Sequence, residues 1–410
     1  PGSDGGRPAG GFGPPVDPVS AAVDTNRDGE ITGDELKDAL TALKQLDRDQ
    51  DGRVVDDELR SLFRGGGPGG RGRRGRGRQQ KLLVDRFDED KSGRLDRSER
   101  LKARQFVKEN NSGDQRGPGR GRGGFGGPGG GGGFGGPEPK PGPQVAKEDA
   151  GSYPDRAFYD ESILRTLFLE FEYDDWEQEL ADFYRSDVDV PATLVVDGKR
   201  YKDVGIAFRG NSSFFTVQEG QKRSFNLTLD YVDKDQDLYG YRTINLLNAH
   251  ADPSFIREVL YNHIARRYIP APQANFVRVV VNGESWGVYL NAQQFNKEFT
   301  EEWFGERGGV RWKVPAGPSG RSLNYNGDEK DAYAGYEIKS KETKRAWKDL
   351  IRVCKILNET PVEELDTELD SVLNVDRALW FLALDNVLLD IDGYHSRGSD
   401  YVMYQDTSLG

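Results

Sequence analysis

The sequence has little cysteine, no long apolar run and fewer positive than negative charges, and each shortage excludes something. Its 410 residues include one cysteine, Cys354, so an intramolecular disulfide framework is impossible. Cys354 lies in a helical pattern of apolar residues, and we expect it to pack in a core. The 57 basic against 69 acidic residues give a net charge of -12, which favours solubility and argues against wholesale nucleic-acid binding.

No apolar run is long enough to be a signal segment or a membrane span. The most apolar one, at 380–388, is short and interrupted, and it predicts a core helix that ends near Leu389. The chain begins with Pro1 and stops at Gly410, directly after a predicted strand. We therefore treat it as a fragment, in which missing targeting signals prove nothing.

Glycine and proline gather in three segments that are expected to lack regular structure. Residues 1–18 are predicted to be disordered, and residues 111–150 to form a flexible linker between two structured regions, 19–110 and 151–410. The third segment, 65–78, mixes glycine with arginine. Such a tract can bind phosphate-rich polymers, but the acidic surroundings favour a flexible, solvated insert.

A twelve-residue pattern occurs three times before residue 100. Side-chain oxygens stand at positions 1, 3 and 5, glycine at position 6 and glutamate at position 12, as in a Ca²⁺-binding EF-hand loop. The expected ligands are Asp24, Asn26, Asp28, Glu30 and Glu35, then Asp47, Asp49, Asp51, Arg53 and Glu58, then Asp88, Asp90, Ser92, Arg94 and Glu99, where Glu30, Arg53 and Arg94 act through backbone carbonyls. Residues 19–110 thus resemble a small all-α EF-hand-like calcium module.

Residues 151–410 have a globular composition, and their predicted elements change from strands to helices. Alternating apolar residues predict strands at 164–171, 190–196, 201–208, 224–231, 275–281 and 286–291. Apolar residues at helical spacing predict helices at 174–184, 252–264, 295–304, 344–357, 361–369 and 376–389. Asp197-Gly198 and Asn282-Gly283 predict tight hairpin turns. An α+β domain is expected, with a β-rich lobe before an α-rich lobe, which is the layout of protein-kinase-like enzymes.

The helix predicted at 252–264 starts from a clear signal. Asp252-Pro253 is expected to provide the N-cap and the first helical residue. His263 falls on the apolar face, which predicts a buried core histidine rather than a ligand. Glu258 falls off that face.

Small and basic residues follow the predicted strand at 201–208. The loop reads Arg209, Gly210, Asn211, Ser212 and Ser213, and the next strand is preceded by Lys222 and Arg223. Such an arrangement can cradle phosphates with backbone N–H groups and a cation. A tight turn beside two surface cations explains the same residues, so both interpretations remain open.

Acidic residues crowd the end of the helix predicted at 376–389. Asp390, Asp392 and Asp400 lie where the helix dipole disfavours carboxylates unless something compensates. A bound cation or a proton-transfer role would compensate. The alternative is a solvated turn that caps the helix.

Five motifs in this order resemble the CotH (spore coat protein H) kinase family. They are RGNSS from Arg209, KRSFNL from Lys222, DPSFIR from Asp252, NGESWGVY from Asn282 and DIDGY from Asp390. The resemblance covers about residue 158 to the end and implies an atypical two-lobed protein-kinase fold, here incomplete at its C-terminus. It also implies phosphorylation of Ser or Thr in secreted or surface proteins, with ATP and Mg²⁺ or Mn²⁺.

The resemblance also implies roles for residues in these motifs. The loop at 209–213 would lie over the ATP phosphates, Lys222 or Arg223 would pair with the α- and β-phosphates, and Glu258 would hold that cation. Adenine would meet the backbone after the strand that ends at Asn291.

Two aspartates complete the implied site. Asp392 would be the catalytic base and Asp400 a metal ligand. Many relatives have Asn at the position of Asp400, and the next metal-binding Asp of the family would lie beyond Gly410.

Three functions remain open on the sequence. The first is a kinase with an attached calcium module, the second a surface binding protein on a catalytically degenerate CotH fold, and the third a structural calcium-binding matrix protein. The third leaves the motifs from 209 to 392 unexplained. Calcium loops joined to such a domain by a Gly-rich linker also resemble exported bacterial proteins, so we expect the periplasm, the cell surface or the extracellular space.

Overall fold

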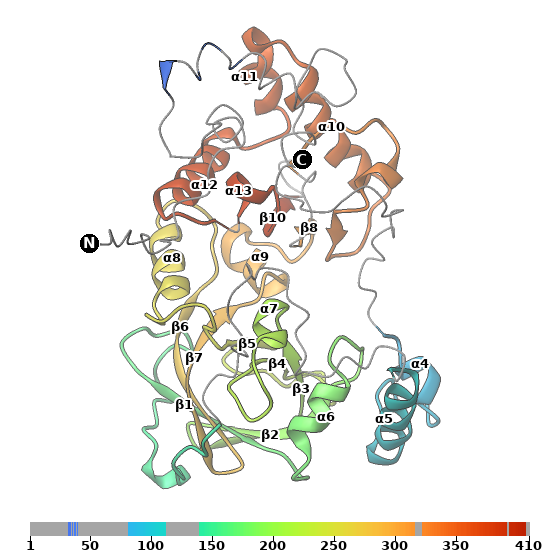
Figure 1. Ribbon diagram of the computed structural model, residues 1–410, viewed down its shortest axis with the longest axis vertical. Coiled ribbons are helices and arrows are strands. Elements are labelled where there is room, and N and C mark those ends of the chain that lie inside the picture. Colours follow the sequence, from blue (N-terminus) through green and yellow to red (C-terminus); the bar gives the residue numbers. More distant parts are fainter. Residues whose placement is uncertain are drawn as a thin grey trace, which may run out of the picture. The chain divides into compact units, whose positions relative to one another are not determined.

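The computed structural model describes residues 32, 33, 35, 37, 39, 81–111, 139–315, 322–391 and 393–406. The chain divides into two compact units, Pro1–Gln79 and Gln80–Gly410. The third predicted calcium loop, at 88–99, therefore lies in the same unit as the downstream domain, whereas the sequence pattern grouped it with the first two loops. The helices and strands named below all belong to this second unit (Figure 1).

A closed barrel of seven strands forms the β-rich part of the second unit. The strands are β1 (Arg165–Glu170), β2 (Val190–Val196), β3 (Lys199–Arg209), β4 (Ser224–Thr228), β5 (Thr243–Leu247), β6 (Ala274–Val281) and β7 (Glu284–Gln293). Their order around the barrel is β1-β2-β3-β4-β5-β7-β6, and the barrel closes through a parallel pairing of β1 with β6. All other neighbours pair antiparallel.

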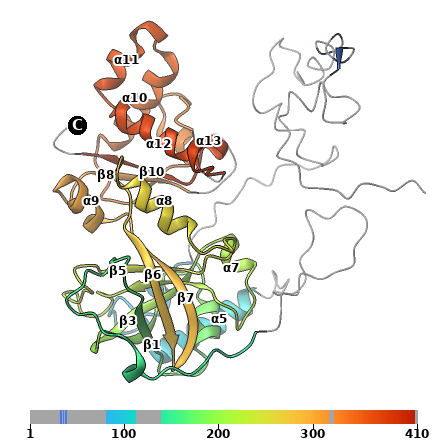
Figure 2. The same cartoon turned by 90° about the vertical axis from the view of Figure 1, so that its left-hand side faces the viewer.

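Two predicted hairpins of this barrel are confirmed. β2 and β3 join through Asp197-Gly198, and β6 and β7 through Asn282-Gly283. All four turn residues have positive φ, between 48° and 88°, which is the backbone that suits the twist of a two-residue hairpin. Figure 2 shows β6 and β7 running side by side along their length.

The barrel interior is filled by alternate residues of its strands. Fully buried side chains include Leu167, Leu169, Leu194, Ile206, Phe225, Leu227, Ile244, Leu246, Val277, Val279 and Tyr289. Each large apolar side chain that is fully buried contributes about 1.5–3 kcal/mol, so this set is a major source of stability. Helix α6 (Trp176–Asp182) adds Trp176, whose ring stacks on Phe171 at 4.9 Å and meets Trp286 edge-on at 5.3 Å.

Helices α4 (Val84–Phe87) and α5 (Arg97–Asn111) pack against the barrel domain. Leu83, Leu95, Ala103 and Val107 belong to the same buried cluster as the barrel interior. The backbone N–H groups of Leu83 and Val84 donate to the Asp187 carboxylate. The third loop is thus not separated from the downstream domain by the predicted flexible linker, because the helices on either side of the loop bury apolar side chains in the barrel cluster.

The described part of the predicted linker follows the β6–β7 hairpin. Val145 N–H donates to Gly283 O at 2.8 Å, and Ser285 N–H donates to Pro143 O at 2.9 Å. A 3₁₀ turn at Lys147–Asp149 ends this segment. Residues 139–150 are therefore held by backbone hydrogen bonds to the hairpin.

The α-rich part contains six helices in the described residues and one small sheet. The helices are α8 (Arg257–Ala265), α9 (Lys297–Phe304), α10 (Ala346–Glu359), α11 (Val362–Asp370), α12 (Val375–Val387) and α13 (Tyr394–Arg397). The strands β8 (Val310–Val314), β9 (Glu337–Ile338) and β10 (Tyr401–Gln405) pair in the order β10-β8-β9. Cys354 is fully buried in this core beside Trp312 and Tyr401, as expected.

Helix α8 differs from its prediction at the start and in its buried face. It begins at Arg257 because Phe255 adopts a positive φ of 60°, while the Asp252 carboxylate accepts hydrogen bonds from Ser254 and from Arg257 N–H. His263 is not a core residue: it is exposed and pairs with Glu161 at 2.9 Å. The apolar pattern failed here because the helix buries Val259, Asn262 and Ala265 instead.

Helix α12 ends where the sequence predicted but is not a core helix among the described residues. Only Leu384 and Asp385 are buried. Trp380 stacks on Tyr268 at 4.3 Å and remains partly exposed, and Val387 is exposed. The buried face is therefore narrow, and one of its two residues is an aspartate.

Candidate functional site

The loop at the end of β3 is held by side chains from the α6 end. Tyr184 donates to Gly210 O at 2.5 Å, and Arg185 donates to Asn211 Oδ1 at 2.7 Å. Gly210 has a φ of 98°, and a Cβ there would lie 2.1 Å from Ser213 Oγ. Only glycine fits this turn, which leads into the short helix α7 (Ser212–Phe215).

Lys222 is largely desolvated by its neighbours. Its Nζ donates to Val288 O at 2.6 Å and lies 4.3 Å from the Phe255 ring centre and 4.9 Å from that of Tyr289. Burial lowers the pKa of Lys222 from 10.5 to about 8. The ammonium is thus close to titrating at the upper end of the physiological range.

Arg223 faces the barrel core instead. It is buried, its guanidinium lies 4.6 Å from the Phe214 ring centre, and it donates to Val217 O at 3.2 Å. Glu177 lies 3.8 Å away. Arg223 therefore acts as a packing residue of the barrel, and Lys222 is the better candidate for a ligand contact.

Glu258 does not hold Lys222, contrary to the prediction. Among the described residues Glu258 is linked to Asn262, which donates to Oε1 at 3.1 Å, and to the charge of Arg209. Burial raises the pKa of Glu258, the Asn262 hydrogen bond and Arg209 oppose the rise, and Asp390 adds to it. Arg209 is the cation whose charge reaches Glu258, whereas Lys222 contacts Val288 O and two aromatic rings.

Asp400 lies near the same charges. It precedes β10, and the negative charge of its carboxylate raises the pKa of Lys313 in β8. Desolvation lowers the pKa of Lys313 first, Arg209 and Lys339 lower it further, and Glu337 and Asp400 oppose this. Lys313 was missed at the sequence level because a lysine in a short strand carries no signal of its own.

Arg209, Glu258, Lys313, Asp390 and Asp400 thus form one group of interacting charges, which we call the junction cluster. Its members come from β3, α8, β8, the loop after α12 and the start of β10. The cluster thus draws its residues from both the barrel and the α-rich part. Phosphate groups bind to cations, and divalent metals bind to carboxylates, so a group with both kinds of charge suits a metal–phosphate ligand.

The loop after α12 is held by hydrogen bonds to Asp385, a residue that the sequence patterns did not single out. Asp385 Oδ2 accepts from His395 N–H at 2.9 Å, and Asp385 O accepts from Asp390 N–H at 2.9 Å. The predicted base, Asp392, lies outside the described residues. An acidic residue in the middle of an apolar helical run is the signal that could have identified Asp385.

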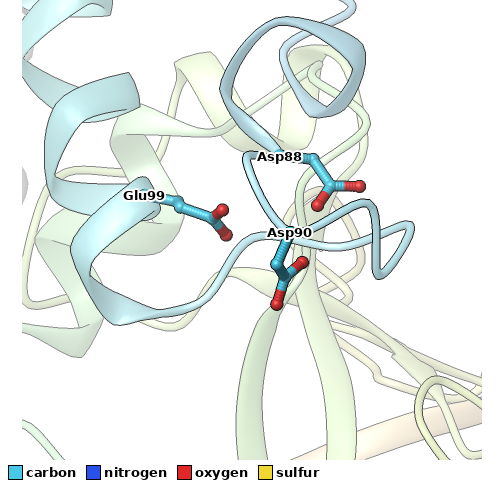
Figure 3. A group of neighbouring side chains, drawn as sticks. All are labelled: Asp88, Asp90 and Glu99. Atoms are coloured by element: carbon cyan, nitrogen blue, oxygen red, sulfur yellow. The ribbon is translucent and has the colours of Figure 1, made fainter.

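The third calcium loop brings three of its predicted ligands together. Carboxylate oxygens of Asp88, Asp90 and Glu99 lie within 4.8 Å of one another (Figure 3). Gly93 has a φ of 80° and donates its N–H to Asp88 Oδ2 at 2.8 Å, so the sharp turn expected at position 6 is present. A donor set of carboxylate oxygens in a twelve-residue loop fits Ca²⁺.

The other two predicted ligands of this loop face one another. Ser92 Oγ donates to Arg94 O at 2.9 Å, and Ser92 N–H donates to Asp88 and Asp90. The carbonyl expected as the ligand at position 7 is therefore occupied by Ser92. Binding a cation would replace this hydrogen bond.

Of the first two loops the structure describes one predicted ligand. Glu35 is nearly buried, and Thr32 N–H donates to its Oε2 at 2.9 Å. The same pairing of positions 9 and 12 recurs in the third loop, where Asp96 N–H donates to Glu99 Oε2 at 2.8 Å. The remaining predicted ligands lie outside the described residues, namely Asp24, Asn26, Asp28, Glu30, Asp47, Asp49, Asp51, Arg53 and Glu58.

In the described parts of the chain, every helix is too short or too polar to cross a bilayer. The model of the CotH kinase protein family matches residues 206–410, a range that begins within β3 and contains the junction cluster. The chain is also 26% identical to inner spore coat protein H of Bacillus subtilis (strain 168) over 236 residues, which are 57% of this chain and 62% of that relative. The chain therefore belongs to the CotH kinase protein family.

Proposed function

We propose that this chain is a protein kinase that uses ATP and Mg²⁺ or Mn²⁺ to phosphorylate Ser or Thr on exported or surface proteins. The observation that carries the proposal is the junction cluster, in which the charges of Arg209 and Lys313 and those of Glu258, Asp390 and Asp400 are within electrostatic range of one another. Phosphoryl transfer needs mainly positioning and charge neutralisation, so a site that combines cations with carboxylates suits it. The proposal takes the barrel and the α-rich part as the two lobes of an atypical kinase fold.

Each charged group has a role in this proposal. The loop at 209–213 and Lys222 would hold the phosphates, with Arg209 kept in place by Glu258. Asp400 would hold the metal ion, which when bound neutralises phosphate charge. Asp392 would orient the acceptor hydroxyl and accept its proton. The family membership and the coat location of the Bacillus relative support a surface protein as acceptor.

The alternative is a surface binding protein on a catalytically degenerate CotH fold. The observation that favours it is Lys222, whose ammonium binds Val288 O and two aromatic rings, so that a kinase-like lysine–glutamate pair is replaced. This alternative expects a folded protein with no nucleotide affinity.

We also propose that the third loop binds Ca²⁺ through Asp88, Asp90 and Glu99. The support is the close approach of their carboxylates and the packing of the following helix α5 on the barrel domain. A cation there would remove the repulsion among three carboxylates. The site would therefore stiffen the attachment of α4 and α5.

The kinase proposal is tested by calorimetry and thermal shift with ATP and Mg²⁺ or Mn²⁺, together with phosphate transfer to a Ser/Thr protein. The wild type should bind ATP and melt at a higher temperature with it. Lys222→Ala should lose the shift, whereas Asp392→Ala should keep binding and lose transfer. Lys202→Ala, an exposed lysine on β3, is the control and should behave as wild type. Absence of any nucleotide binding by the wild type would favour the binding-protein alternative.

A further inference from the structure

Asp385 is a buried acid at a position where burial is costly. Its side chain is 2% exposed, although α12 is otherwise mostly exposed along the described residues. A buried carboxyl is retained only where hydrogen bonds or a function compensate its desolvation. The contacts of Asp385 show what compensates the burial of its carboxyl.

The carboxyl of Asp385 lies inside the turn that follows α12. Oδ2 accepts from His395 N–H at 2.9 Å, and the backbone O of the same residue accepts from Asp390 N–H at 2.9 Å. The turn therefore closes around one residue, which binds its start through the main chain and its end through the side chain. Leu389 adopts a positive φ of 55° to enter this turn.

Gly393 shows how tightly the turn wraps the carboxyl. A Cβ at this position would lie 2.5 Å from Asp385 Oδ1 and 3.0 Å from Asp390 Oδ2. The first contact is shorter than a side chain tolerates and the second is tight, so a side chain at 393 would push the Asp385 carboxyl out of its place. Asp385 Oδ1 is buried and has no hydrogen-bond partner among the described residues.

The ionisable groups around the Asp385 carboxyl affect one another's pKa. Burial raises the pKa of Asp385, the His395 N–H opposes the rise, and Asp390 adds to it. Tyr261 of α8 lies near enough that Asp385, Asp390 and Glu258 help burial to raise its pKa to about 12. Asp385 thus contacts Asp390, which belongs to the junction cluster.

We propose that Asp385 is a positioning residue whose carboxyl and backbone carbonyl fix Asp390 and His395, the described residues on either side of position 392, and thereby act on Asp392. The inference rests on the proposed function, because Asp392 is the base only there. Without this carboxyl, His395 N–H and the turn lose their buried partner. A base displaced by about 1 Å from a reacting hydroxyl slows transfer by about 100-fold.

The test compares Asp385→Ala with Asp385→Asn in the full chain. Asparagine keeps an oxygen for His395 N–H and offers an N–H group toward Asp390, so it should retain kcat within a few-fold. Alanine should lower kcat for phosphate transfer by about 100-fold and leave KM for ATP unchanged, because the turn carries the base and not the ATP contacts. Asp376→Ala, in the first turn of the same helix, is the control and should resemble wild type.

Amide hydrogen exchange over residues 389–398 provides a readout that needs no activity. Exchange should accelerate in Asp385→Ala and stay near the wild-type rate in Asp385→Asn. If Asp385→Ala proves unstable, Gly393→Ala provides a second variant, which should also lower kcat by crowding the carboxyl. Unchanged exchange and kcat in Asp385→Ala, or equal losses in both Asp385 variants, would overturn the inference. A wild type that transfers no phosphate would defeat the kinase proposal alone, and the exchange result would still decide whether Asp385 fixes the turn.

Discussion

Arg100 of α5 donates to Glu179 of α6 at 3.0 Å, and the two side chains are 5% and 1% exposed. Arg97 contacts the other oxygen of Glu179 at 2.7 Å, and Arg104 contacts Asp182 at 2.9 Å. One face of α5 thus matches the acidic face of α6. Helix α5, which follows the predicted calcium loop at 88–99, is therefore fastened to the barrel domain by desolvated charges as well as by apolar side chains.

We expect Glu179→Ala to destabilise the second unit strongly. Removing one partner leaves Arg100 buried without its countercharge, which costs about 3–5 kcal/mol. Urea unfolding followed by tryptophan fluorescence measures the change in unfolding free energy. The control is Glu359→Ala, whose partner Lys355 is half-exposed, and which should cost less than about 1 kcal/mol. Similar small effects from both would contradict the role given to the α5–α6 contact.

Calcium should slow hydrogen exchange in α4 and α5. An ion bound only by the folded loop stabilises it by about 2.7 kcal/mol at a concentration 100 times its dissociation constant. Asp88→Asn combined with Asp90→Asn should abolish this protection. The matched change in the first loop, Asp24→Asn with Asp28→Asn, should leave it intact. Exchange in α5 that ignores calcium in the wild type would rule out the third-loop site.

Gly210→Ala should weaken ATP binding more than it weakens the fold. Alanine at this φ would place its Cβ 2.1 Å from Ser213 Oγ, so the loop must move. Gly240 has a φ of 88° with open space around it, so Gly240→Ala carries the same backbone strain of about 1–2 kcal/mol without the clash. Calorimetry should show a loss of about tenfold or more in affinity for Gly210→Ala only. Equal affinities in the two variants would separate the loop from nucleotide binding.

ATP affinity should fall as the pH rises from 7 to 9. The pKa of Lys222 is lowered by burial to about 8, so its ammonium is present below pH 8 and lost above it. If this charge contacts phosphate, affinity decreases by up to about tenfold for each pH unit above the pKa. Lys222→Met should bind weakly at pH 7 and show no such slope.

The lowered pKa of Lys222 has the opposite effect on the stability of the protein without ATP, which should rise with pH. Between pH 8 and 10.5 the unfolded chain binds more protons at Lys222 than the folded chain does, so stability from this group rises with pH. Denaturant midpoints measured at pH 8 and pH 10 should show the rise in the wild type and a smaller one in Lys222→Met. A flat affinity profile in the wild type would mean that Lys222 does not contact the phosphates.

Local signals predicted local structure well. Asp197-Gly198 and Asn282-Gly283 give hairpins because few dipeptides accept positive φ at both positions of a tight turn. The strand predicted at 190–196 has the same bounds as β2. Its residues first alternate between buried and half-buried positions, and this alternation is what the apolar pattern detects. The third calcium loop likewise brings Asp88, Asp90 and Glu99 together, because all its parts lie within twelve residues.

Side-chain partners across the fold were less predictable. Glu258 was paired with Lys222 on the sequence. In the structure Glu258 is within electrostatic range of Arg209, and Lys222 instead donates to Val288 O and lies against two aromatic rings. His263 lies on an apolar helical stripe and is exposed beside Glu161. Helical spacing shows that a face exists but not what covers it.

The sequence by itself therefore determined the two hairpin turns, the bounds of β2, the approach of Asp88, Asp90 and Glu99 and the family motifs, because each depends on neighbouring residues. It did not predict β5, β8 or β9. Only the tertiary structure decided that the third loop is fastened to the barrel domain. It also decided that the charges of Arg209 and Asp390 act on Glu258, and that Asp385 binds the turn after α12. These relationships join residues far apart in the chain. Their energies depend on burial and distance, which no local pattern specifies.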